Sequence, residues 1–322
     1  FFDENQLNLM KARVFELLER RGVKMAHPEV LNRLQKAGAR VDNDTSMVRF
    51  HNDSLEANLR LAPRKITLAG RTEENRLEIP HPDGTFHTRT NTGGQSWIEL
   101  ETGNYRPVIA ADVAEWARLA DKLEHIDFGA FPVPSDVPPA SVDVHALNLI
   151  LKNIDKHVWV QPYTSESVEY LIDLSLLAAG GAKELKANPL VSFITCSLTP
   201  LEFKAMDLDI ILQCARIGIP LHACSLPGAG TTAPVTVPGV VILAAAEILA
   251  MIAVSQVVQP GSPIIAAPLI FSTDMMSGRS LQSSVESIQG AALAVQFIKN
   301  SFKLTTHTYG IGTDSPALDE QS

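Results

Sequence analysis

Cysteine is scarce in this sequence. Cys196, Cys214 and Cys224 are the only three, and none forms a CxxC pair. An odd number without that spacing excludes a disulfide framework and indicates a reducing compartment, so we expect a cytoplasmic protein. The opening FFDENQLNLM lacks an initiator Met and the basic-then-apolar order of a signal peptide, which leads us to expect a trimmed chain.

Positive charge is also limited. The chain has 27 Lys and Arg against 36 Asp and Glu, a net charge of −9, with no basic stripe or block. That balance disfavours a nucleic-acid partner. No GxGxxG turn follows any predicted strand, which disfavours a dinucleotide site.

One long hydrophobic run raises the question of a membrane. Residues 237–258, VPGVVILAAAEILAMIAVSQVV, are numerous enough to span a bilayer. Glu247 and Gln256 interrupt the run, and strand-like segments flank it. We therefore predict a buried helix of a soluble α/β protein and no membrane partner.

The first 108 residues predict a helical and β-hairpin region. Apolar periodicity and Gly or Pro stop signals predict helices at 5–22, 27–38 and 54–62, and shorter strand-like pieces at 65–70, 76–88 and 96–107.

Residues 109–322 show a different pattern, in which predicted short apolar strands alternate with predicted helices. A helix at 111–123 leads in, and the predicted strands are 125–134, 156–163, 189–198, 219–226, 262–271 and 303–312. Helices are predicted at 165–181, capped by Ser165, and at 199–218, where Thr199, Pro200 and Glu202 fit an N-cap, a first-turn proline and a capping box.

This alternation predicts an α/β fold, specifically a (β/α)₈ TIM barrel with an N-terminal appendage. Six of eight units are visible. The last residues, GTDSPALDEQS, are expected to begin a sixth helix, and we expect two further units to be missing from this sequence. A doubly wound open sheet is the alternative.

In a barrel, the active site lies at the carboxyl ends of the strands. Those positions here carry polar and aromatic side chains with almost no charge: Phe131, Gln161, Tyr163, Thr195, Ser197, His222, Cys224, Phe271, Thr273, Asp274, His307 and Tyr309. Lysine is absent from the set, which disfavours Schiff-base chemistry. Only Asp274 is an acid, which disfavours a carboxylate pair for hydrolysis.

Two interpretations of the polar set stay open. Cys196, His222, Cys224 and His307 are residue types that bind zinc. Alternatively, each Cys is a small buried hydrophobe, while His307 and Tyr309, which share a strand face, either fill the barrel interior or meet a substrate. In the second case Phe131, Tyr163, Phe271, Tyr309 and Trp97 could form an aromatic cage for a quaternary ammonium.

Several separated motifs carry a family resemblance. They are TGNYRP ahead of ADVAEWARLADKL, then GAGTTAPVTVPG, VQPGSPII, STDMMSG and YGIGTDSPALDEQ. The chain is similar over essentially its whole length to the trimethylamine methyltransferase family of corrinoid-dependent enzymes. Only standard residues occur, so it resembles the branch without pyrrolysine, which includes glycine betaine methyltransferase.

The resemblance implies methyl transfer from a quaternary amine such as glycine betaine to the Co(I) of a separate corrinoid protein. The corrinoid, a cobalamin, would come with that partner, and we expect no tightly bound cofactor or metal in this chain and a homo-oligomer. Alternatives are a zinc-dependent methyltransferase for a thiol or alcohol and a non-catalytic quaternary-amine-binding protein.

We predict catalytic roles for His307, Tyr309 and Asp274. The predicted substrate-binding residues are Phe131, Gln161, Tyr163, His222, Gly228, Gly230, Thr231, Thr232 and Phe271. The uncharged loop 227–236 is expected to offer glycine amides and threonine hydroxyls to a substrate carboxylate or to the edge of the corrin.

Overall fold

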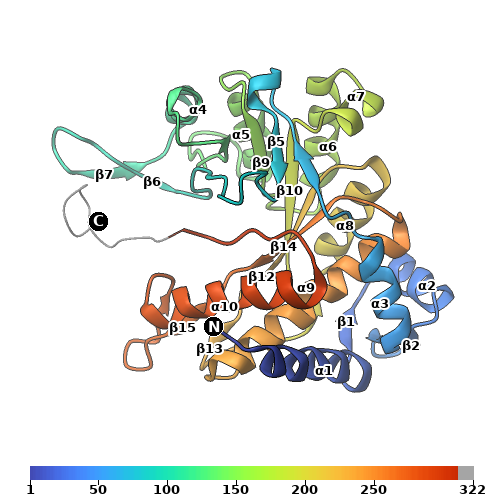
Figure 1. The fold of residues 1–322 in the computed structure, drawn as a ribbon. Coiled ribbons are helices and arrows are strands. Elements are labelled where there is room, and N and C mark those ends of the chain that lie inside the picture. The colour runs from blue at the N-terminus through green and yellow to red at the C-terminus, as the bar shows by residue number, and fades with distance from the viewer. Residues whose placement is uncertain (311–322) are drawn as a thin grey trace. The chain divides into compact units, whose positions relative to one another are not determined.

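The computed structural model describes residues 1–310, which form an α/β fold with parallel strand pairs, as predicted (Figure 1). The described residues group into two compact units. The first unit contains 1–64, 195–216 and the described part of 221–313, and the second contains 65–194 and 217–220. The predicted boundary near residue 108 falls inside the second unit, and as a statement about domains it stays a prediction.

The first unit combines the N-terminal helices with later βα elements. Its helices are α1 (Glu4–Arg20), α2 (Pro28–Lys36), α3 (Asn52–Leu61), α8 (Ala205–Ile217, except its last residue), α9 (Val237–Val258) and α10 (Val285–Phe302). Its strands are β1 (Val23–Met25), β2 (Arg40–Asp42), β3 (Met47–Arg49), β11 (Glu202–Phe203), β12 (Leu221–Ser225), β13 (Gly228–Ala229), β14 (Ile264–Pro268), β15 (Phe271–Thr273) and β16 (Ser280–Leu281). Strands β12 and β14 pair in parallel, with His222 opposite Ile265.

Helix α9 forms the centre of this unit. It contacts α1, α3 and α10 as well as β12 and β14 (Figure 1). By length and composition it could cross a membrane, yet 78% of its most apolar window is buried inside the protein. A helix that is apolar on all sides needs protein around it, and the surrounding elements supply this. The prediction of a buried core helix is confirmed.

A local cap signal explains the start of α1, whereas a long-range strand pair overrides the cap signal predicted at Thr199. Asp3 accepts a hydrogen bond from the Gln6 backbone at the start of α1. The helix predicted to begin at Thr199 instead begins at Ala205, because Glu202 pairs in parallel with Lys24 of β1. The Glu202 carboxylate lies 3.0 Å from the Lys24 ammonium, so it does not close a capping box.

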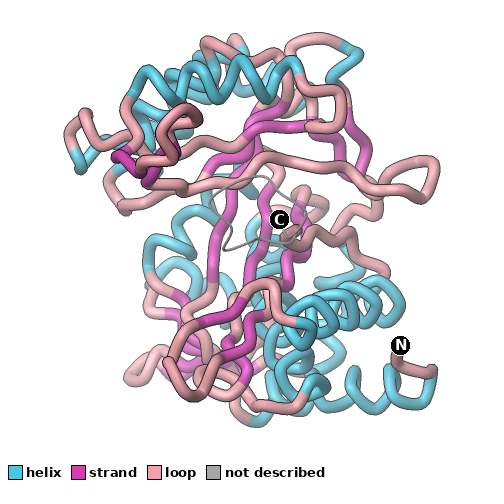
Figure 2. Tube along the Cα trace, turned by 90° about the vertical axis from the view of Figure 1, so that its left-hand side faces the viewer, coloured by secondary structure: helices cyan, strands magenta, loops and turns pink. Residues whose placement is uncertain are grey.

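The second unit carries the other parallel strands. Its helices are α4 (Ala110–Lys122), α5 (Val142–Leu151), α6 (Ser167–Ala179) and α7 (Ala182–Ala187), with short 3₁₀ turns at Glu73–Asn75 and Pro139–Ser141. Its strands are β4 (Ile66–Leu68), β5 (Leu77–Ile79), β6 (Ser96–Ile98), β7 (Tyr105–Pro107), β8 (Phe128–Gly129), β9 (His157–Val160) and most of β10 (Val191–Cys196). Figure 2 draws the strands of the described residues in magenta and the helices in cyan. Strand β9 pairs in parallel with both β8 and β10.

Two further predictions need correction. Helix α6 begins at Ser167, and Thr164 rather than Ser165 accepts a hydrogen bond from its first turn. The segment predicted as a strand at 303–312 makes only an isolated parallel bridge, between Thr306 and Ala266, within its described part. The helix predicted from GTDSPALDEQS lies outside the described residues.

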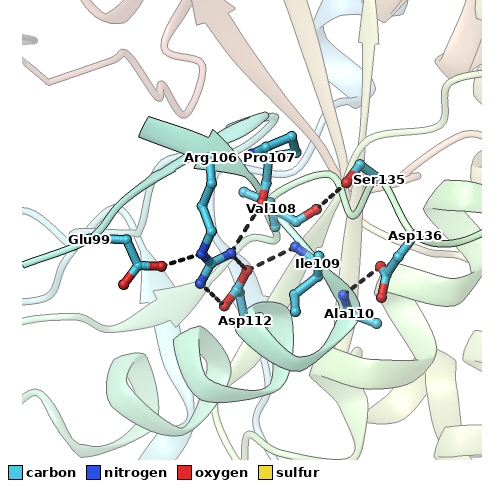
Figure 3. A network of polar contacts seen from close by, with 9 residues as sticks. All are labelled: Glu99, Arg106, Pro107, Val108, Ile109, Ala110, Asp112, Ser135 and Asp136. Carbon is cyan, nitrogen blue, oxygen red and sulfur yellow. Dashed lines mark hydrogen bonds and ion pairs between the residues drawn. The ribbon is translucent and has the colours of Figure 1, made fainter. Parts of the chain in front are cut away.

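An ion-pair network ties the β6–β7 hairpin to α4 (Figure 3). Arg106 donates from two guanidinium nitrogens to the carboxylate of Asp112, at 2.6 and 2.8 Å, and it also binds Glu99. Asp112 in turn accepts from the Ile109 backbone at 2.8 Å, which satisfies an amide at the helix start. The motif TGNYRP therefore orients the hairpin relative to the helix that follows it.

Candidate active site

Two histidines meet beside the β12–β14 pair in the first unit. His222 lies on β12, and the His307 backbone donates to the Ala266 carbonyl of β14 at 2.8 Å. Their ring centroids are 5.0 Å apart, with the planes at 80°. His222 has no solvent-exposed surface, whereas His307 is half-buried, so His307 presents the outer ring of the pair.

Two aromatic rings lie where the β14 segment ends. The rings of Phe271 and Tyr309 are 5.6 Å apart and tilted by 30°, and both side chains are half-buried. The neighbouring Thr308 hydroxyl donates to the Pro268 carbonyl at 2.9 Å, which holds this segment along β14. The structure thus brings together two of the predicted aromatic residues.

The Tyr309 hydroxyl already has a hydrogen-bond partner within the protein. It donates to the backbone carbonyl of Ile270. Burial raises the pKa of Tyr309 to about 12, so the phenol stays protonated at neutral pH. The exposed part of this residue is therefore chiefly an aromatic surface, and its hydroxyl is poorly placed to move a proton.

The loop 227–236 differs from its prediction. The Gly228 carbonyl accepts from the backbone amides of Thr231, Thr232 and Ala233, and the Gly230 amide donates to the Ala233 carbonyl. The Gly228 amide donates to the Thr232 hydroxyl at 2.9 Å. The expectation of free amides is wrong for these positions, because the loop closes into a turn on its own carbonyls.

The hydroxyls of Thr231 and Thr232 belong to exposed residues but already have hydrogen-bond partners in the protein. Thr231 donates to the Gly228 carbonyl at 3.2 Å and lies 3.1 Å from the Thr273 hydroxyl on β15. These contacts join the loop to the β15–β16 hairpin, beside the strand pair that matches Gly228 with Phe271. The loop therefore helps to place the Phe271 ring.

Asp274 closes the turn of that hairpin. Its carboxylate accepts from the Met276 amide at 3.1 Å, from the Ser277 amide at 3.3 Å and from the Ser277 hydroxyl. The Ser277 hydrogen bond is the main cause that holds the pKa of Asp274 below its ordinary value. The described contacts give this carboxylate a turn-closing function, and its catalytic role stays a prediction.

The remaining predicted residues belong to the second unit. Phe131 is fully buried, and Gln161, which follows β9, is half-buried. The Tyr163 amide donates to the buried Asp143 carboxylate at 2.8 Å, and burial raises the pKa of the Tyr163 phenol to about 12. The Trp97 ring lies 5.8 Å from the guanidinium of Arg106, which already supplies a cation to that ring.

The zinc alternative lacks a ligand set. Within residues 1–310, no group of three or more His, Cys, Asp or Glu side chains is arranged to hold a metal ion. Cys196, His222, Cys224 and His307 accordingly do not come together as a tetrahedral site requires.

A buried carboxylate was missed as a functional candidate. Glu247 of α9 is fully buried and accepts hydrogen bonds from side chains that follow β10 and end β12. The available signal was a single acid within 22 otherwise apolar or neutral residues.

Comparison with known proteins places these features in context. The family model described as trimethylamine methyltransferase (MTTB) matches residues 1–322. A trimethylamine methyltransferase MttB of Desulfitobacterium hafniense is 28% identical over 329 residues, covering 100% of this chain and 64% of that protein. A glycine betaine methyltransferase of the same species is 26% identical, covering 99% of this chain and 66% of that protein. The chain thus spans about two thirds of the length of these relatives.

Solved structures show the same fold. The monomethylamine methyltransferase MtmB of Methanosarcina barkeri aligns with a TM-score of 0.57 at 13% identity, covering 96% of this chain and 61% of that chain. At that identity the likeness supports the α/β architecture alone.

Proposed function

Because the chain belongs to the trimethylamine methyltransferase family, we propose that the protein transfers a methyl group from a quaternary amine such as glycine betaine to the Co(I) of a corrinoid protein. The amine and the corrinoid protein are then its two partners. The similarity to a glycine betaine methyltransferase supports this choice of substrate class.

The observation that carries the proposal is the half-buried pair Phe271 and Tyr309. A quaternary ammonium binds aromatic faces and needs no hydrogen-bond donor, and each such contact contributes about 0.5 to 2 kcal/mol. The Tyr309 hydroxyl donates to the Ile270 carbonyl. In this proposal, the ring of Tyr309 rather than its hydroxyl therefore binds the ammonium group.

The chemistry of the substrate fits a site with few acids. The electron pair of the broken N–CH₃ bond stays on nitrogen, so glycine betaine leaves as the neutral amine dimethylglycine and needs no proton donor. The Co(I) of the partner supplies the nucleophile that takes the methyl group. The protein then has to hold one N–CH₃ bond in line with the nucleophile and exclude water, which is a positioning task.

The other predicted residues take parts in the same proposal. His307 would border the amine through its half-buried ring, with His222 packed behind it. Thr231 would act through its contact with Thr273, by holding the loop beside Phe271. For Phe131, Gln161, Tyr163, Gly228, Gly230 and Thr232, contact with the substrate stays a prediction.

The finer architectural expectations are also proposals. We propose that the parallel strands belong to a (β/α)₈ barrel. A cytoplasmic location and a homo-oligomer are expected as well. A crystal structure of the full-length protein would test barrel closure.

The decisive experiment measures methylation of cob(I)alamin by purified protein with a panel of amines. We expect turnover with glycine betaine or a related quaternary amine and none with dimethylglycine. Turnover only with trimethylamine would contradict the quaternary substrate, and binding without any methyl transfer would favour a non-catalytic binding protein.

A neutral isostere provides a matched control for binding. In 3,3-dimethylbutanoate, a tert-butyl group replaces the trimethylammonium group of glycine betaine without its charge. If aromatic faces select the cation, this compound should compete at least about tenfold more weakly than glycine betaine. Equal competition would refute recognition of the positive charge.

A further inference from the structure

Glu247 is the single ionisable residue of α9, and it has no solvent-exposed surface. An isolated buried carboxylate is strongly unfavourable unless it is paired or hydrogen-bonded. Its presence in the middle of the most apolar helix therefore requires donors from neighbouring elements, and the structure supplies four.

Two segments provide these donors. From the stretch after β10, the Ser197 hydroxyl, the Thr199 hydroxyl at 2.9 Å and the Leu201 amide at 2.8 Å donate to the carboxylate. From the end of β12, the Ser225 hydroxyl donates at 2.6 Å. Both carboxylate oxygens are used, so the side chain joins two strand ends to the helix.

The stretch after β10 needs such an anchor. Leu201 has a φ of +59°, a left-handed conformation that is unfavourable for a branched non-glycine residue. Its amide is the one that donates to Glu247. The carboxylate thus helps to hold a strained backbone at the point where the chain turns toward β11.

The Ser225 donor connects Glu247 with the candidate site. The Ser225 carbonyl accepts from the Leu269 amide at 2.9 Å, and the Pro227 carbonyl accepts from the Phe271 amide at 3.0 Å. Glu247 is therefore hydrogen-bonded to the end of β12, and the backbone of 225–227 is in turn hydrogen-bonded to the segment 269–271, which carries one ring of the aromatic pair.

We propose that Glu247 is a positioning residue, which fixes the end of β12 and the loop 227–236 so that the Phe271 ring holds the amine in line for transfer. The inference rests on the proposed function. It assigns Glu247 no contact with the amine: the residue acts through Ser225 and the backbone that follows.

The kinetic test uses Glu247→Gln, which keeps the shape of the side chain but places an amide NH₂ among donors. A small displacement of the reacting groups can lower a rate by about 10²-fold. We expect kcat to fall by about that factor and KM for the amine to change less than about threefold, because ring contacts tolerate displacement better than in-line transfer does.

Two variants of Thr199 keep the test informative if Glu247→Gln fails to fold. Thr199→Val removes one donor while keeping the shape of the side chain, and Thr199→Ser retains the hydroxyl. We expect the first variant to lower kcat about tenfold and the second to stay within about twofold of the wild type.

The matched control is Ser255→Ala, near the C-terminal end of α9. Ser255 lies 2.6 Å from the Ser262 hydroxyl, so this variant also loses a buried hydrogen bond of the same helix. We expect its kcat to be unchanged. Wild-type kcat in folded Glu247→Gln, or equal losses in Thr199→Val and Ser255→Ala, would overturn the proposal.

Hydrogen–deuterium exchange of residues 225–236 gives a readout that does not depend on the reaction. Exchange should accelerate at least about tenfold in Glu247→Gln or Thr199→Val but not in Ser255→Ala. If the wild type transfers no methyl group from any amine, the proposed function fails, and the exchange data alone decide whether Glu247 positions the loop. Unchanged exchange would refute that role.

Discussion

Replacing Tyr309 by Phe separates the ring from the hydroxyl. The hydroxyl donates to the Ile270 carbonyl, and the pKa of the phenol is raised to about 12. If the ring alone acts on the substrate, Tyr309→Phe should keep kcat/KM within about threefold of the wild type. A general acid in this position would instead contribute about 10²- to 10⁴-fold to the rate. The two roles therefore differ by more than tenfold.

The magnitude for the ring follows from the aromatic contact. Tyr309→Leu removes both ring and hydroxyl, and loss of a cation–π contact of about 0.5 to 2 kcal/mol should lower kcat/KM by about 2- to 30-fold. The change should be in KM rather than in kcat. Tyr309→Phe should also lower the free energy of unfolding by about 1 kcal/mol, because the Ile270 carbonyl loses its donor.

The assay follows methylation of cob(I)alamin at several amine concentrations, with urea unfolding measured on the same preparations. Tyr170→Phe is the matched control, because Tyr170 is 63% exposed on α6 and should affect neither measurement. If Tyr309→Phe lowers the turnover rate by about 10²-fold or more, the reasoning is refuted, since a ring without its hydroxyl would then be insufficient.

Three further predictions concern stability, each measured by urea unfolding. Burial lowers the pKa of His157 to about 4, so between about pH 6.5 and pH 4 the unfolded chain binds a proton that the folded protein does not. The free energy of unfolding should therefore fall by up to roughly 1.4 kcal/mol per pH unit as the pH is lowered to 4. His157→Gln should abolish this slope. Asp112→Asn should cost about 1 to 2 kcal/mol near pH 7, a modest value because Arg106 is 34% exposed. The Arg106 hydrogen bond holds the pKa of Asp112 below its ordinary value, so this difference should persist above about pH 4 and vanish as the pH falls through the folded-state pKa. Gly230→Ala should cost about 1 kcal/mol, because Gly230 has a φ of +91°, and an unchanged midpoint would contradict that strain.

The Gly230 geometry also changes how the loop is tested. A bulky residue at Gly230 would be a direct test of the loop only if it left the fold intact. Because the left-handed backbone disfavours any side chain, such a variant would mix strain with loss of contacts. Thr199→Val and Thr199→Ser probe the same region without that complication.

Local sequence signals succeeded where a segment's own residues decide its structure. Helix α1 follows from apolar periodicity and the Asp3 cap, and α9 follows from a long apolar run with a neutral start. The alternation of strands and helices predicted the parallel pairs of β9 and of β12. In these cases the pattern along a contiguous stretch of the chain carries most of the information.

The sequence predicted which residue types occur in the candidate site but not which groups hydrogen-bond to one another. The Gly, Thr and Pro content of loop 227–236 indicated a loop after β12, while the partners of its amides proved to be its own carbonyls. Thr199 was assigned to a helix cap, whereas its hydroxyl donates to Glu247, 48 residues later in the chain. Such pairings depend on which strands lie side by side.

The sequence by itself determined the family, the α/β class and the burial of α9, because motifs, alternation and hydropathy are properties of contiguous residues. Only the tertiary structure decided that Glu247 joins two strand ends, that Tyr309 offers its ring rather than its hydroxyl, and that β11 pairs with β1. Each of these depends on hydrogen-bond partners far apart in the chain, and a buried polar group takes whichever partner the packing brings within reach.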